Sequence, residues 1–224
     1  MKLDTVDRAR QDLLEAVRLL AAAGVMSHSG HANLSARLEG ERMLLTARGA
    51  VSNLRPEHLA VVGFGAEDPE RKFEPATAEI VPMHAEVYRV RADIGSIIHT
   101  HSPHVTAFSL ANRPLPCRYE ALLRFGQAEE IPVVPWAPRG SQQSVQGIID
   151  ALARQPQTRA VLLGNHGLLA FGDSPPAAAR LVIAMEEAAE AELASTVIGG
   201  ARDFPAGALQ QVRRSMARVG STIP

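Results

Sequence analysis

Two apolar runs separated by a four-residue turn constrain the fold of this chain most strongly. The segment AVLLGNHGLLAFG, residues 160–172, places Gly-Asn-His-Gly between two leucine-containing stretches. Glycine-rich turns of this length join neighbouring antiparallel strands, so both runs are expected to be strands of one sheet. Any fold proposed for the chain must therefore contain this hairpin.

The rest of the sequence predicts further strands and the helices that flank them. Strands are expected at NLSARL, MLLTAR, LAVVGF, GSIIHTH and IPVVPW, and the prolines of the last segment favour a sheet edge. Apolar spacing and capping residues predict helices over residues 5–23, 78–92, 103–112, 141–155 and 175–199. These elements predict an α/β fold in α/β/α layers around a largely antiparallel sheet, forming one domain over residues 1–224.

Charge and cysteine content exclude several classes of function. The formal net charge is -1, with acids and bases mixed along the chain, so no basic field is present to bind a nucleic acid backbone. The N-terminal segment MKLDTVDRARQDLLEAV contains acidic residues and is neither a signal peptide nor a membrane span. The single cysteine, Cys117, excludes an internal disulfide framework and is typical of the reducing cytoplasm.

Histidine spacing gives the first indication of chemistry. In SIIHTHSPH, His99 and His101 are two residues apart on an expected strand, so both side chains point to one face. Such a pair either shares a metal ion or merely shares a strand. A catalytic metal site usually has a third protein ligand, and His166 at the tip of the Gly-Asn-His-Gly turn is the best candidate. Glu79 could complete the site or act on the substrate, whereas His84 is expected to be a packing or helix-surface residue.

The motifs taken together and in order resemble the class II aldolase/adducin family. The resemblance runs from about residue 10 to residue 198 and rests on five stretches of sequence. They are GHANLSAR from Gly30, TARG from Thr46, the Glu79 segment with its following helix, HTHSPHVTA, and GNHG. The family's fold is a mainly antiparallel sheet between helical layers.

The resemblance implies a metal centre and an acid/base group. It implies that His99, His101 and His166 hold one divalent ion per subunit, Zn²⁺ or Mn²⁺, and that Glu79 is the acid/base, which can also ligate the metal. It also implies a homotetramer with sites near the subunit interfaces. A substrate that chelates the ion through adjacent oxygens would have its enolate-type intermediate stabilised by the metal.

The substrate pocket departs from that of the sugar-phosphate aldolases. Those enzymes typically have a Ser-Ser pair before the glutamate, where this chain has Thr77-Ala78, so one donor to a phosphate oxygen is missing. Arg48 offers a planar fork that suits a carboxylate as well as a phosphate. The residues expected to bind substrate are His31, Asn33, Thr46, Arg48, Gly49 and Thr77.

Two further stretches bear on the reaction. Tyr119 in CRYEALLRFGQ matches a tyrosine associated with the site in related aldolases, and we include it with Glu79 as a catalytic candidate. In WAPRGS, Arg139 precedes a helix whose N-terminus could receive an anion. The C-terminal segment RRSMARVGSTIP lacks the tyrosine that aldolases often use to protonate the aldehyde product, and a decarboxylase would not require it.

These features predict a metal-dependent carbon–carbon lyase, with a decarboxylase of a small hydroxylated carboxylate, aromatic ones included, favoured. The alternative is an aldolase or epimerase acting on a sugar phosphate or a 2-keto acid. A non-catalytic adducin-like assembly module is the remote alternative, against which the intact His99, His101, His166 and Glu79 argue.

Overall fold

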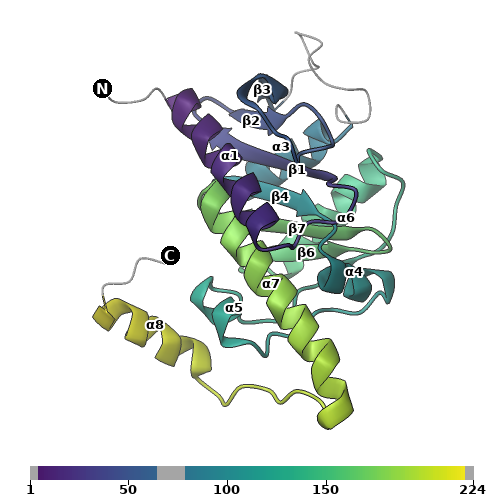
Figure 1. Cartoon of the computed structure of the whole chain (residues 1–224), viewed down its shortest axis with the longest axis vertical. Helices are drawn as coiled ribbons and strands as arrows, with labels where there is room; N and C mark the ends of the chain where they lie inside the picture. The colour runs from purple at the N-terminus through teal and green to yellow at the C-terminus, as the bar shows by residue number, and fades with distance from the viewer. Residues whose placement is uncertain (1–4, 65–78, 220–224) are drawn as a thin grey trace.

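The computed structural model describes residues 5–64 and 79–219, and its centre is a seven-stranded sheet (Figure 1). The strand order is β3-β2-β1-β4-β7-β6-β5, and every pairing is antiparallel except that of β5 with β6. The strands are β1 (Ala32–Leu38), β2 (Arg42–Thr46), β3 (Leu59–Gly63), β4 (Ser96–Thr100), β5 (Val133–Val134), β6 (Ala160–Leu163) and β7 (Gly167–Gly172). The predicted sheet is therefore confirmed, including its edge strand β5.

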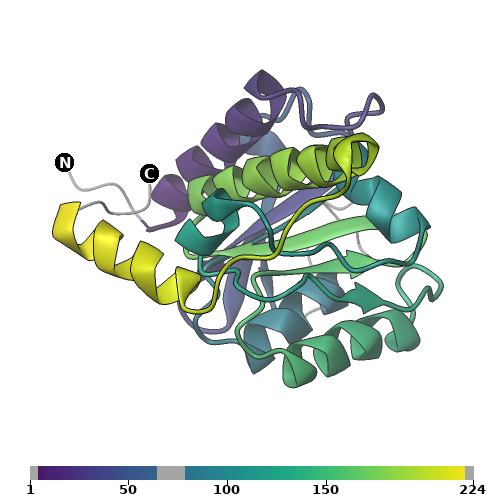
Figure 2. The ribbon, with the colours of Figure 1, turned by 90° about the horizontal axis from the view of Figure 1, so that it is seen from below.

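Helices cover both faces of this sheet (Figure 2). One face packs against α1 (Thr5–Ala22), α4 (Pro103–Leu110), α5 (Glu120–Arg124) and α7 (Pro175–Ser195). The other face packs against α3 (Val81–Val90) and α6 (Gln142–Arg154). Short 3₁₀ turns, η1 (Pro56–His58) and η2 (Thr196–Ile198), and a last helix, α8 (Ala208–Val219), complete the described elements. The layered α/β architecture predicted from the sequence is confirmed.

The two longest helices pack together because their facing residues are apolar at helical spacing. In α1, Leu13, Val17 and Leu20 are buried, and Gly24 ends the helix with a left-handed backbone φ of 68°. In α7, many of the buried residues are alanines, whose small side chains let the helix lie close to α1 and to the sheet. No helix among the described residues is long and apolar enough to cross a membrane.

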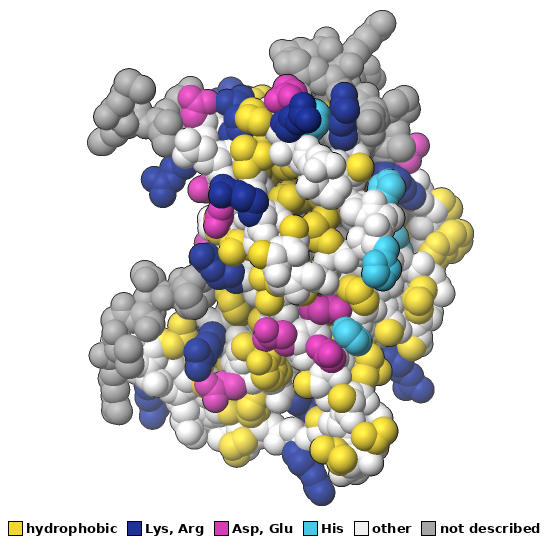
Figure 3. All heavy atoms as spheres, viewed as in Figure 1, with side chains coloured by type: hydrophobic (Ala, Val, Ile, Leu, Met, Phe, Trp, Pro, Cys, Tyr) yellow, Lys and Arg dark blue, Asp and Glu magenta, His cyan; other side chains and the backbone are white. Residues whose placement is uncertain are grey.

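The sheet order determines where the predicted site lies. The strand β4 is the central strand, and its neighbours are β1 and β7. The register pairs Asn33 with His99 and Thr100 with Leu168, so the start of β1, the end of β4 and the β6–β7 turn meet at one end of the sheet. Figure 3, which has the orientation of Figure 1, shows histidine side chains at the surface along the right side, so this part of the molecule is open to solvent.

Candidate metal centre and substrate cavity

Three histidines converge at this end of the sheet. His99 lies on β4, His101 follows the end of β4, and His166 lies in the β6–β7 turn. The ring centroids are 4.9 Å apart for His99 and His101, 4.7 Å for His99 and His166, and 5.0 Å for His101 and His166. One ring nitrogen from each lies within 4.8 Å of the others, which is the arrangement needed to share one ion.

Hydrogen bonds around the three rings hold them in place. The His99 Nδ1–H donates to the carbonyl oxygen of Leu168 at 2.9 Å, which leaves Nε2 of His99 with its lone pair. The His166 backbone N–H donates to the Ser109 hydroxyl at 3.1 Å, so α4 supports the turn. His101 Nε2 is buried and has no hydrogen-bond partner among the described residues. A buried ring nitrogen without a partner fits a bound cation.

The cluster favours neutral imidazoles, the form that ligates metals. Burial, followed by the neighbouring histidines, lowers the pKa of His99 well below its usual value. Burial lowers the pKa of His101 to about 4 and also lowers the pKa of His166. The Arg139 guanidinium adds to the lowering at both His101 and His166, so a positive charge lies near the cluster.

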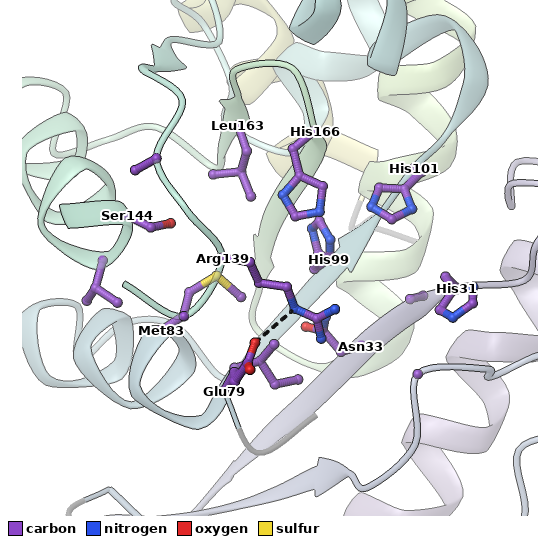
Figure 4. Close-up of a pocket in the computed structure, with 16 residues that line it drawn as sticks. His31, Asn33, Glu79, Met83, His99, His101, Arg139, Ser144, Leu163 and His166 are labelled. Atoms are coloured by element: carbon purple, nitrogen blue, oxygen red, sulfur yellow. Dashed lines mark ion pairs between the residues drawn. The ribbon is translucent and has the colours of Figure 1, made fainter. Parts of the chain in front are cut away.

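A cavity opens in front of the histidines (Figure 4). The side chains of Glu79 and Arg139 face each other across it, with Arg139 Nε 3.9 Å from Glu79 Oε2. Both side chains are about half exposed, at 54% for Glu79 and 49% for Arg139. The apolar part of the lining comes from the start of α3, from α6 and from β6, with Ile80, Met83, Val145 and Leu163. The cavity thus combines a histidine cluster, the Glu79 carboxylate, the Arg139 guanidinium and an apolar wall.

The structure brings together only some of the residues predicted to bind substrate. His31, Asn33, Gly49 and Glu79 line the cavity. Glu79 is not part of the convergent histidine group, and its carboxylate is directed toward Arg139 (Figure 4). Thr77 lies outside the described residues.

Three predicted residues do not line the cavity within this chain. Thr46 is fully buried at the end of β2, where its hydroxyl accepts the Leu34 N–H at 3.2 Å. Arg48 is exposed outside the cavity. Tyr119 precedes α5 and donates its hydroxyl hydrogen to Glu187 Oε2 at 3.1 Å, on the α7 side of the molecule. The catalytic role of Tyr119 stays a prediction.

Sequence reasoning missed the apolar wall and the buried partner of Asn33. Ile80, Met83, Val145 and Leu163 have no chemical signature that separates a cavity residue from a core residue. His84, predicted to be a packing or helix-surface residue, is fully buried, and its Nε2 lies 2.7 Å from Asn33 Oδ1. The helical spacing of His84 and Tyr88 was the available signal that both face the sheet.

The comparison with known families decides the relationship. A profile described as the Class II Aldolase and Adducin N-terminal domain matches residues 11–193. The chain belongs to this family. The resemblance inferred from the histidine and glycine motifs is therefore confirmed.

Two relatives with assigned activities are lyases. The chain is 25% identical over 217 residues to a 5-methylthioribulose-1-phosphate/5-deoxyribulose-1-phosphate aldolase of Rhodospirillum rubrum, covering 94% of this chain and 92% of the relative. It is 30% identical over 212 residues to a 3,4-dihydroxyphthalate decarboxylase of a Terrabacter species, covering 88% of this chain and 85% of the relative. The predicted enzyme class, a carbon–carbon lyase, is confirmed at this level.

A solved structure confirms the fold. An L-fuculose 1-phosphate aldolase superposes with a TM-score of 0.81 at 22% identity, covering 96% of this chain and 98% of the other.

Proposed function

We propose that the protein is a divalent-metal-dependent lyase in which His99, His101 and His166 hold the ion. The observation that carries the proposal is the orientation of the rings, with His99 Nδ1 bonded to Leu168 and His101 Nε2 buried without a partner among the described residues. Three imidazole ligands suit Zn²⁺, whereas Mn²⁺ would also draw on a carboxylate oxygen. The ion would supply positive charge to a substrate oxygen while a neighbouring carbon–carbon bond breaks.

The charge of the cavity favours an anionic substrate. Arg139 and the histidine cluster would both be positive when the ion is bound, and an anion between them would neutralise the repulsion. Arg139 has a planar guanidinium, which can hold a carboxylate or a phosphate by two parallel hydrogen bonds. We therefore assign Arg139 to substrate binding, beside His31, Asn33 and Gly49.

Arg139 would hold an anionic group that the substrate keeps. A carboxylate that leaves as carbon dioxide loses its charge in the transition state, so an arginine bound to it would stabilise the substrate more than the transition state. A second anionic group, remote from the breaking bond, keeps its charge throughout. The substrate that we infer therefore has two polar groups. Its oxygen-rich end lies at the histidines, and an anionic group that the reaction retains lies at Arg139.

Glu79 is assigned as the acid/base. Its carboxylate reaches the same cavity, and it can return a proton to the carbon from which the leaving group has departed. The ion pair with Arg139 at 3.9 Å holds the carboxylate at the cavity wall. A substrate anion that binds Arg139 would compete with Glu79 for the guanidinium.

Between the two lyase reactions, we propose decarboxylation of a hydroxylated carboxylate, with an aromatic ring accommodated by the apolar wall. Ile80, Met83 and Leu163 offer the ring a dry surface, and Thr46, whose hydroxyl could have bound a phosphate, is fully buried outside the cavity lining. The relative from Terrabacter supports this proposal, because the substrate in its name is a dihydroxylated aromatic dicarboxylate.

An aldolase acting on a sugar phosphate is the second candidate. The relative from Rhodospirillum, which covers most of this chain, is named as an aldolase of sugar phosphates. Asn33 and Gly49 line the cavity and could receive a phosphate. A sugar phosphate also has both groups, since its oxygens could face the histidines and its phosphate is retained.

Two assays distinguish the decarboxylase from the aldolase. The Zn²⁺-loaded protein is titrated calorimetrically with phosphoglycolohydroxamate, a mimic of a phosphorylated enediolate, and incubated with hydroxylated aromatic carboxylates while carbon dioxide is measured. Carbon dioxide release that is lost on chelation and restored by metal supports the decarboxylase. Tight binding of phosphoglycolohydroxamate without carbon dioxide release gives the aldolase precedence. Metal retained with neither result would favour the assembly module.

A further inference from the structure

A buried chain of polar side chains runs from the far side of β1 to the cavity. The Tyr88 hydroxyl lies 2.8 Å from Ser35 Oγ, Ser35 Oγ lies 2.7 Å from His84 Nδ1, and His84 Nε2 lies 2.7 Å from Asn33 Oδ1. Ser35 and His84 are fully buried, Tyr88 is 1% exposed and Asn33 is 6% exposed. Only Asn33 lines the cavity.

The direction of these hydrogen bonds follows from Tyr88, the member of the series farthest from the cavity. Burial raises the pKa of the Tyr88 phenol, so the hydroxyl keeps its hydrogen, and the side-chain acceptor within reach of that hydrogen is Ser35 Oγ. Ser35 has one hydroxyl hydrogen, and having accepted from Tyr88 it donates that hydrogen to His84 Nδ1. Burial lowers the pKa of His84 to about 3, so the ring is neutral and its one hydrogen lies on Nε2. His84 Nε2–H then donates to Asn33 Oδ1.

The opposite direction would leave a buried donor unpaired. If His84 Nδ1–H donated to Ser35, Ser35 would donate to Tyr88. The Tyr88 hydroxyl hydrogen would then have no acceptor among these four side chains. An unpaired buried donor costs about 1–3 kcal/mol. The four residues therefore favour one direction, from Tyr88 toward the cavity.

We propose that His84 is a positioning residue that holds the Asn33 amide with its oxygen inward, so that Asn33 presents its NH₂ group to the cavity. The Asn33 side chain then offers donors only, and it selects a substrate oxygen that accepts hydrogen bonds. Asn33 Nδ2 has no hydrogen-bond partner among the described residues, which leaves it available for such a ligand. The inference rests on the proposed function for the substrate it serves, since that substrate is an anion rich in oxygen acceptors.

The tautomer of His84 tests the inference without any substrate. The protein is labelled with ¹⁵N at histidine, and long-range proton–nitrogen spectra are recorded, with the His84 signals assigned by their loss in His84→Gln. The expected result is a neutral ring protonated at Nε2, unchanged between pH 6 and pH 8. A ring protonated at Nδ1 would overturn the inference, because His84 Nε2 would then accept from the Asn33 NH₂ and Asn33 would present its oxygen to the cavity.

A pair of matched serine variants tests the consequence for binding. Ser35→Ala removes the donor to His84, whereas Ser96→Ala removes a buried hydroxyl that donates to the Ser35 carbonyl oxygen at 2.8 Å and takes no part in the chain. The Zn²⁺-loaded proteins are titrated with oxalate, a dianion with acceptor oxygens only. Ser35→Ala should weaken oxalate binding about tenfold or more, as expected for a lost hydrogen bond to a charged group, and Ser96→Ala less than about twofold.

The outcomes separate a positioning role from a structural one. Equal weakening in both serine variants would overturn the positioning role, because loss of packing alone would then explain the effect. If oxalate does not bind the wild-type protein, the proposed function fails at this point. The tautomer then decides the inference about His84 by itself.

Discussion

Replacing Gly167 with alanine should damage the histidine cluster without removing any of its members. Gly167 is the first residue of β7, directly after His166. A Cβ atom there would lie 2.7 Å from His101 Cδ2 and 2.7 Å from the Thr100 carbonyl oxygen. The distance to the ring carbon is about 0.8 Å shorter than a normal carbon contact of about 3.5 Å. The contact with the carbonyl forces the start of β7 to shift away from β4, and the contact with the ring displaces His101 as well.

The expected size of the effect follows from that displacement. Overpacking of this kind costs about 1–3 kcal/mol of the free energy of unfolding. A ligand ring moved by most of an ångström should weaken Zn²⁺ binding about 10–100-fold, the range seen when the surroundings of metal ligands are altered. Binding is measured by competition with a chromophoric chelator, and unfolding by urea titration of the metal-free protein.

Gly172→Ala is the matched control, because it lies at the other end of the same strand. Its Cβ would lie 2.6 Å from the backbone nitrogen of Ala178, so it should destabilise the fold to a similar extent. It should leave the affinity for Zn²⁺ unchanged. Undiminished Zn²⁺ binding by Gly167→Ala, or an equal loss in Gly172→Ala, would refute the reasoning.

Three further outcomes are expected. Glu79→Gln should keep its metal and lose about 10²–10⁴ in turnover, measured with whichever substrate is identified, and near-normal turnover would remove Glu79 from the acid/base role. His84 has a pKa of about 3 when folded, below its unfolded value, so the unfolded chain binds more protons between these values and stability falls as the pH falls below about 6.5. The contribution of His84 alone is about 2 kcal/mol between pH 7 and pH 5, and equal urea stability at these two pH values would contradict it. Glu186 accepts from the backbone N–H groups of His104 and Val105 at 2.8 and 3.0 Å, which anchors the start of α4. Glu186→Gln should therefore lower the free energy of unfolding by about 1–3 kcal/mol, while the exposed Glu190→Gln should leave it almost unchanged. Equal stability of these two variants would rule out the anchoring role.

Local patterns predicted that the three histidines converge, because the geometry of the cluster is mostly local. Alternation along β4 and into the residue after it places His99 and His101 on one side, and a tight glycine turn presents His166. The pairing of β4 with β7, which joins the two motifs, links residues far apart in the sequence. The sequence patterns did not predict that pairing, because periodicity alone does not determine which strands are neighbours.

Residues outside the strand ends were harder to place. Thr46 was expected in the substrate pocket, but its hydroxyl bonds across to β1, because register at the end of β2 directs it toward the neighbouring strand. Tyr119 lies on the α7 side of the sheet, which depends on the path of the whole segment between α4 and β5. The helix α8 was not predicted, although Leu209, Val212 and Met216 show helical spacing that could have indicated it.

The metal content of the protein shows whether His99, His101 and His166 hold an ion. The wild-type protein and His101→Ala are each equilibrated with Zn²⁺, dialysed against metal-free buffer and analysed for metal, with circular dichroism recorded on the same samples. We expect one ion per chain in the wild-type protein and almost none in a folded His101→Ala. A wild-type protein without bound metal, or a folded His101→Ala that retains a full complement, would contradict it.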